Sequence, residues 1–266
     1  MSNLQSNLIQ INAFFFKIWL ITKKRVFHLF EILFWPAIGL VSVGLLTRFL
    51  HLDSNMVAFI LIGVIALSIV QIGQLDISYV ILYSIWNKSL KQELAAPVNM
   101  FHLIAGSWFM GIIHSLLVLF LLSAFSNYAF GFRFLQQGLS PIAWFFCGLL
   151  LTSAAVGIFV CALAFRFGGR AHVGANSIVS VMILLSGIYY PVEVLPAPLR
   201  IVSACIPVTY FLEYFRSFYG FPTVIGNHSL LLGYALAILY VMAATGTLLA
   251  AVRHSRRSGI LLKMSE

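Results

Sequence analysis

The polar side chains that interrupt the apolar runs of this 266-residue chain are few, and they mark where its chemistry would take place. Asp76 lies within such a run, with Tyr79 and Tyr83 on the same helical face at i+3 and i+7. A second polar stripe follows the same predicted helix: Gln71, Gln74 and Ser78. Two interpretations of Asp76 stay open. In the functional interpretation, Asp76 forms part of the wall of a polar pathway or an anchor for the coupling region. In the structural interpretation, it belongs to a satisfied hydrogen-bond cluster between helices.

Two more ionisable residues lie in apolar runs. Glu31 is expected to pair with Arg25 or Lys24, and His114 is expected to be a packed polar residue. We expect Asp76, Glu31 and His114 to lie at different depths. A membrane-embedded enzyme needs convergent acids, bases or nucleophiles, so this expectation argues against one.

Catalytic motifs are absent from the sequence. There is no G-x-x-x-x-G-K-[ST] phosphate loop, because the single Lys-Ser pair, Lys88-Ser89, has no glycine before it. No H-E-x-x-H or G-x-S-x-G motif occurs, and Cys147, Cys161 and Cys205 have no metal-ligand spacing. We therefore predict no catalytic residue, no metal site and no cofactor in this chain. Nucleotide-driven movement of a solute would need hydrolysis by another chain.

The elements that must position these residues are membrane helices. Of all residues 61% are hydrophobic and only 9% are charged, whereas a soluble domain has about 25% charged residues. The fold class is thus an all-α integral membrane protein, with spans of roughly 20 apolar residues each. Six are predicted: 29–50, 57–84, 102–126, 141–165, 173–190 and 229–252. Residues 1–26 are predicted to form an amphipathic interfacial helix. The alternative is a frayed polar start to the first span.

The basic residues predict the orientation of the spans. The formal net charge is +9, and with the N-terminus inside, twelve of sixteen Lys and Arg residues lie on the cytoplasmic side. Cytoplasmic loops of membrane proteins are enriched in these residues. We expect both termini, including the tail 253–266, in the cytoplasm, and the chain in the inner (plasma) membrane.

The segment 191–222 holds five of the eight prolines, yet it is rich in aromatic and aliphatic residues. Proline divides it into pieces near 199–205 and 208–219, each too short to span the hydrocarbon core of about 30 Å. Irregular backbone at membrane depth is tolerated where protein buries it. We predict two short re-entrant helices at the outer face. An ordinary extracellular loop is the alternative.

Two stretches carry a resemblance to a known family. The first is Lys-Gln-Glu-Leu-Ala-Ala-Pro-Val at 91–98. The second is Ser-Gly-Ile-Tyr-Tyr-Pro-Val-Glu-Val-Leu-Pro at 186–196, followed by Ile-Pro-Val-Thr-Tyr at 206–210 and Glu-Tyr-Phe-Arg at 213–216. Together they resemble the permease subunit of type-2 ABC exporters, which export drugs, capsular polysaccharide, O-antigen or teichoic acid. The order of predicted elements also matches, and the resemblance covers essentially the whole chain.

The resemblance implies a single permease domain over 1–266 that forms a homodimer or close heterodimer. Two separate ATP-binding subunits would bind ATP and Mg, so this chain would not itself be an enzyme. Residues 87–100 would form the cytoplasmic coupling segment that docks on the ATPase, with contacts by Lys91, Glu93, Leu94 and Pro97. Other expected partners are membrane lipids, and no nucleic acid is expected.

The resemblance also suggests a pathway lined with aromatic rings, on which sugars stack in polysaccharide exporters. The candidates, besides Asp76, Tyr79 and Tyr83, are Tyr189, Tyr190, Tyr210, Tyr214 and Phe218. Drugs or lipids would suit the same surface, and the sequence slightly favours the drug and amphiphile branch. The alternatives from other functional classes are a membrane-embedded lipid-modifying enzyme and an ion-coupled carrier. A carrier would typically show interrupted helices in both halves, and here only the second half does.

Overall fold

The computed structural model describes residues 3–24, 26–90, 92, 100–223 and 228–257. They are mostly helical, without a strand in the described ranges, which confirms the all-α prediction. The α-helices are α1 (Asn3–Lys24), α2 (Val26–Phe49), α3 (Ser54–Trp86), α5 (Met100–Phe130), α6 (Leu139–Phe167), α7 (Ala171–Leu185), α8 (Ala197–Ser203), α9 (Pro207–Ser217) and α10 (Ser229–Arg257). Short 3-10 turns lie at Phe134–Gln137, Gly168–Arg170 (η2) and Val192–Val194.

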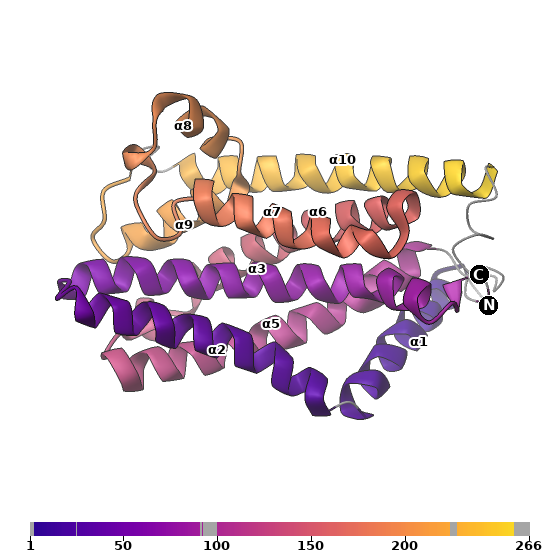
Figure 1. The fold of residues 1–266 in the computed structure, drawn as a ribbon, viewed down its shortest axis with the longest axis horizontal. Helices are drawn as coiled ribbons and strands as arrows, with labels where there is room; N and C mark the ends of the chain where they lie inside the picture. The colour runs from indigo at the N-terminus through magenta and orange to yellow at the C-terminus, as the bar shows by residue number, and fades with distance from the viewer. Residues whose placement is uncertain (1–2, 25, 91, 93–99, 224–227, 258–266) are drawn as a thin grey trace.

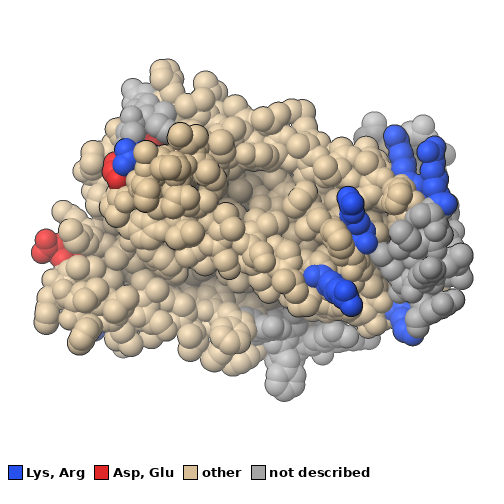
Figure 2. All heavy atoms as spheres, turned by 45° about the horizontal axis from the view of Figure 1, so that its top comes forward, with Lys and Arg blue, Asp and Glu red and all other residues tan. Residues whose placement is uncertain are grey.

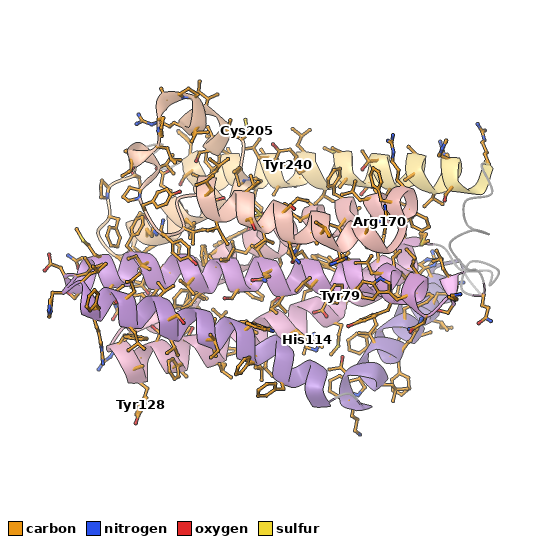
Figure 3. All side chains as sticks on the ribbon, in the orientation of Figure 1. Tyr79, His114, Tyr128, Arg170, Cys205 and Tyr240 are labelled. Carbon is orange, nitrogen blue, oxygen red and sulfur yellow. The ribbon has the colours of Figure 1, made fainter. Side chains whose placement is uncertain are left out.

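The long helices run back and forth along one axis of the molecule (Figure 1). The short helices α8 and α9 lie at one end of this bundle, which we name the hairpin end. The end of α10 lies at the opposite end, which we name the tail end. Labelled side chains help to locate the two ends: Tyr128 lies toward the hairpin end, and Arg170 lies toward the tail end (Figure 3).

Five stretches of the described chain are long and apolar enough to cross a membrane. One of them, Leu139–Leu185, comprises both α6 and α7. The chain reverses between these helices at η2, where Gly168 adopts a positive φ of 64° that glycine tolerates without strain. The predicted span 173–190 differs from the structure, because α7 ends at Leu185 after 15 residues. At 1.5 Å per residue it is about 22 Å long, shorter than a full span.

The predicted pair of short helices before the last span is confirmed as α8 and α9. Pro196 and Pro207 lie at the starts of these helices, where the missing N–H costs nothing. The helix α9 packs against α6 and α10, and it buries Phe211 and Phe215 completely. The segment is therefore folded into the protein and is not an ordinary loop.

Small residues let α3 pack closely in the centre of the bundle. A Cβ atom added to Gly157 of α6 would lie 2.7 Å from Cβ of Ile77, and one added to Gly73 would lie 2.5 Å from Oγ of Ser153. Helices in lipid gain little from the hydrophobic effect and associate through such close packing. These glycines therefore determine how closely α3 and α6 approach.

The first helix, α1, is separate from α2 and turns away from it (Figure 1). It packs on α5 at Gly106, where an added Cβ would lie 2.8 Å from Cβ of Phe14. Thr22 of α1 is 3% exposed, whereas the side chains of Phe16 and Trp19 are exposed. Exposed aromatic side chains suit a membrane interface, and the interfacial position of α1 stays a prediction.

We predict that Gly157→Ala destabilises the protein, because the new methyl group would overlap Ile77 at the crossing of α3 and α6. Overpacking of this kind typically costs about 1–3 kcal/mol. Gly246→Ala in α10 is the matched control, since an added Cβ has no neighbour within 4 Å there. Thermal unfolding in detergent should show a lower midpoint for Gly157→Ala alone. Equal midpoints for the two variants would contradict this account of the crossing.

Candidate functional site

A cavity with a volume of about 690 Å³ lies at the hairpin end. It is enclosed by the start of α3 and the chain between Ser186 and Pro222. Its lining residues are Leu52, Met56, Phe59, Ile60, Ser186, Tyr189, Tyr190, Pro191, Val192, Glu193, Arg200, Ser203, Ala204, Thr209, Tyr210, Glu213, Arg216, Phe221 and Pro222. We name it the hairpin cavity. Its size lies within the range of small-molecule sites, about 300–1,000 Å³.

The structure brings three of the candidate pathway aromatics together in this cavity: Tyr189, Tyr190 and Tyr210. Tyr214 and Phe218 contact each other at 5.2 Å between ring centroids and do not line it. The Tyr210 hydroxyl donates to the Ala204 carbonyl at 2.7 Å, and the Tyr190 hydroxyl donates to the Leu184 carbonyl. These bonds orient the two rings, so that part of the aromatic wall is preorganised. Burial raises the pKa values of Tyr189 and Tyr210, which keeps both phenols protonated at pH 7.

The side chain of Arg216 ties the cavity walls together. It is only 5% exposed. Its Nη1 atom donates to the Gly187 carbonyl at 2.6 Å, and Nη2 donates to the Ile188 and Phe59 carbonyls, each at 2.8 Å. One guanidinium group thus joins α9 to the chain that follows α7 and to α3.

The same guanidinium lies on the Phe59 ring, with Cζ 3.4 Å from the ring centroid. A cation over an aromatic face is stabilised by the ring quadrupole, and more so where water is excluded. Burial lowers the pKa of Arg216 to about 9, which leaves the side chain cationic at pH 7. The cavity wall therefore contains a buried positive charge whose hydrogen bonds go to neutral carbonyl groups.

Two glycines make the Arg216 contacts possible. Gly187 has a φ of 70°, in the left-handed region that favours glycine. A Cβ atom added to Gly63 would lie 2.0 Å from the Ile188 carbonyl oxygen and 2.9 Å from Nη2 of Arg216. The backbone of α3 and the chain after α7 can approach this closely only because Gly63 has no side chain.

A smaller cavity of about 120 Å³ lies between α1 and the second half of α3. We name it the tail-side cavity. It is lined by Lys17, Ile18, Thr22, Asp76, Tyr79, Val80, Tyr83, Ser84, Asn87 and Ser89. The rings of Tyr79 and Tyr83 contact each other and Trp86, whose ring also contacts His172. The remaining candidate pathway residues, Asp76, Tyr79 and Tyr83, thus share this second cavity.

Asp76 and His114 form a side-chain contact within hydrogen-bond distance between α3 and α5. The distance from Nδ1 of His114 to Oδ2 of Asp76 is 2.8 Å, and their side chains are 2% and 8% exposed, respectively. The expectation that these residues lie at different depths was wrong, because the sequence does not reveal how α3 and α5 align. The finding favours a satisfied contact between helices for Asp76. Because Asp76 and His114 lie side by side, a difference in their depths no longer argues against a membrane-embedded enzyme.

The coupling residues named from the resemblance, Lys91, Glu93, Leu94 and Pro97, lie outside the described residues. The described chain ends before them at the tail end of α3 and resumes at α5. The side chain of Glu31 also lies outside the described part. The roles assigned to these residues therefore stay predictions.

Comparison with known proteins decides the family. A family model described as ABC-2 type transporter matches residues 13–220, which include every helix from α2 to α9. The chain belongs to the ABC-2 type transporter family. It is accordingly a multi-pass membrane protein and an ABC transporter permease. An uncharacterized protein of Archaeoglobus fulgidus is 47% identical over 58 residues, which are 22% of this chain and 91% of that protein.

Sequence reasoning did not assign Arg216 a role in this ABC-2 family permease, although it is the central residue of the hairpin cavity. A signal was present, since Arg216 is the single cation in the aromatic and aliphatic stretch 201–222. Lys17 of the tail-side cavity was also missed, because its partner helix α3 follows more than 35 residues later. Ser186 and Ser203 carried no signal beyond their proximity to proline-rich turns.

We predict that Arg216→Ala lowers stability by at least about 2 kcal/mol, because it leaves buried carbonyl groups without their donor. Arg200→Ala is the matched control. Arg200 also donates to two carbonyls, of Glu193 and Leu195, but it is exposed, so water replaces its bonds. Thermal unfolding should separate the two variants clearly. A similar, small effect of both would mean that Arg216 does not hold the hairpin end.

Proposed function

We propose that this chain is the permease subunit of an ATP-driven exporter, which moves an amphiphilic drug, lipid or glycan-type substrate out of the cytoplasm. Family membership supports the transporter class, and the hairpin cavity is the observation that supports an organic substrate. A cavity of about 690 Å³ with tyrosine and phenylalanine walls suits apolar bodies or sugar rings. ATP hydrolysis is assigned to a separate subunit, because the sequence has no phosphate loop.

The charge distribution supports a cytoplasmic tail end. Figure 2 shows several Lys and Arg side chains gathered toward this end, whereas the acidic side chains visible in that view lie toward the hairpin end, beside a further basic side chain. Arg166 and Arg170 lie at the turn between α6 and α7, and Arg253 and Arg257 lie in the last turns of α10. By the positive-inside rule both termini then face the cytoplasm. The hairpin cavity would open toward the outside, in the inner (plasma) membrane.

Coupling to the ATPase is proposed for residues 87–100, which follow α3 at the tail end. The tail-side cavity adjoins this segment through Asn87 and Ser89 and includes Lys17 of α1. Motion of a docked ATPase would therefore reach α1 and α3 together. The proposed subunit composition is two ATPase copies per transporter.

A second copy of this chain is proposed to cover one face of α7. Asn176, Ser177 and Ser180 are exposed on this helix, next to Val181 and Leu184. The Ser177 and Ser180 hydroxyls donate to backbone carbonyls of their own helix, but a helix cannot satisfy the amide of Asn176 in this way. Polar side chains facing lipid are costly, and small ones let two helices approach closely. A homodimer built on α7 would cover them.

We predict that cysteines introduced singly at Ser177, Ser180 and Leu184 of α7 form disulfide-linked dimers in a background without the three native cysteines. Disulfides need Cα atoms about 4.4–6.8 Å apart, so at least one position near a two-fold axis should cross-link strongly. Leu239→Cys on the exposed face of α10 is the control, since Leu239 is 54% exposed and no partner is proposed there. Cross-linking at Leu239 with none on α7 would refute the α7 dimer.

We predict that Glu93→Lys prevents co-purification of the ATP-binding subunit and abolishes ATP-dependent transport in proteoliposomes. A surface charge change alone usually alters stability by less than about 0.5 kcal/mol. A like charge placed against a basic docking groove costs several kcal/mol. The control is Glu193→Lys at the hairpin end, which should leave co-purification intact. If Glu93→Lys binds the ATPase and transports like wild type, Glu93 is not a docking residue. The absence of ATP-dependent transport by the wild-type complex would overturn the exporter function itself.

A further inference from the structure

Three polar groups of the hairpin cavity are buried without a hydrogen-bond partner in the described structure. They are the hydroxyls of Ser186 and Ser203, which are 1% and 0% exposed, and the Nε–H group of Arg216. All three residues line the cavity. A buried polar group without a partner costs about 1–3 kcal/mol, so such groups call for a ligand or water.

Several buried hydroxyls within the helices have a local partner instead. The hydroxyls of Ser68, Ser84 and Thr152 donate to the carbonyl four residues earlier, at 2.8–3.0 Å. This local bond satisfies a hydroxyl within its own helix. Ser186 follows the last residue of α7, and Ser203 is the last residue of α8, so both lie where helical geometry ends. Neither hydroxyl makes such a local bond.

The chemistry of the three groups indicates what they would bind. Each can donate a hydrogen bond, and Arg216 adds a positive charge in a buried position, where electrostatic attraction is stronger than in water. Phosphate and carboxylate oxygens form the strongest hydrogen bonds with such donors. Around them the walls are formed by apolar and aromatic residues such as Met56, Ile60 and Tyr189.

We propose that the hairpin cavity binds an anionic amphiphile, with a phosphate or carboxylate head at Ser186, Ser203 and Arg216 and an apolar chain along the aromatic wall. The proposal rests on the proposed export function and specifies its substrate class. Glu193 and Glu213 also line the cavity. They are more exposed than Arg216, so water screens their charges. The buried cation therefore dominates the choice of head group.

The test compares ligands that share an octyl chain and differ in the head group. Octyl phosphate, octyltrimethylammonium and octyl glucoside would be titrated into the full chain in lipid nanodiscs, with empty nanodiscs as the blank, by calorimetry. Inorganic phosphate is added as a fourth ligand. We expect saturable binding of octyl phosphate, at least about tenfold tighter than the cationic and neutral analogues and than inorganic phosphate.

The variant Ser186→Ala/Ser203→Ala tests the head-group site without touching the Arg216 hydrogen bonds. Because the two hydroxyls have no partner, their removal should not lower the unfolding midpoint. Affinity for octyl phosphate should fall about tenfold, which corresponds to about 1.4 kcal/mol. Ser123→Ala is the matched control, because the Ser123 hydroxyl is also buried and unpartnered but lies in α5 outside the cavity. It should bind like wild type.

Several results would overturn the proposal. Tighter binding of octyltrimethylammonium would assign head-group choice to the carboxylates, and equal binding of all three octyl ligands would leave only an apolar site. If inorganic phosphate binds as tightly as octyl phosphate, the octyl group contributes nothing to binding, and the site does not select an amphiphile. Wild-type affinity in the double serine variant would exclude the hydroxyls. The binding assay contains no ATPase, so failure of ATP-driven transport and failure of this site are distinguishable.

Discussion

Buried backbone groups need hydrogen-bond partners, and this constraint accounts for the most unusual part of the structure. Helices satisfy their own backbone groups, but the chain between α7 and α9 is irregular in places and needs other donors. Arg216 supplies them. Its guanidinium binds the Gly187 and Ile188 carbonyls in this irregular stretch and also the Phe59 carbonyl of α3. A single cation thereby makes a non-helical segment compatible with burial.

The same interaction creates the hairpin cavity. Because Arg216 holds the chain after α7 against α3, the short helices α8 and α9 leave a space in front of the start of α3. Gly63 and Gly187 permit this arrangement, one by having no side chain at a close contact and the other by its positive φ. The attachment of the chain after α7 to α3 and the shape of the hairpin cavity therefore depend on the same few residues. A substitution that weakens the hydrogen bonds of Arg216 is expected to change ligand binding in the hairpin cavity as well.

Between the two cavities the bundle is closely packed. The glycines Gly73 and Gly157 bring α3 and α6 together, and the Asp76–His114 contact joins α3 to α5 on the tail side. The helix α3 lines both cavities, the hairpin cavity with its first turns and the tail-side cavity with its second half. A shift of α3 would therefore alter both cavities together. This geometry is consistent with a transporter in which events at one end affect the other.

The sequence by itself determined the membrane class, the helical fold and the family. Long apolar runs can be satisfied only as helices in lipid. Prolines divided 191–222 into short helical pieces predicted near 199–205 and 208–219, and two stretches carried the family resemblance. The resemblance also suggested a pathway wall of five aromatic residues in this segment, of which Tyr189, Tyr190 and Tyr210 line the hairpin cavity and Tyr214 and Phe218 do not. These features depend on neighbouring residues along the chain, which a sequence displays directly.

Only the tertiary structure decided the contacts between distant residues. The alignment of α3 with α5 brings Asp76 to His114, 38 positions apart, and the folding of α9 onto α3 brings Arg216 to Phe59, 157 positions apart. The early end of α7 and the unpartnered hydroxyls of Ser186 and Ser203 likewise follow from three-dimensional packing. Hydropathy and spacing describe one helix at a time. The depth and rotation of one helix against another are set by close packing of specific side chains.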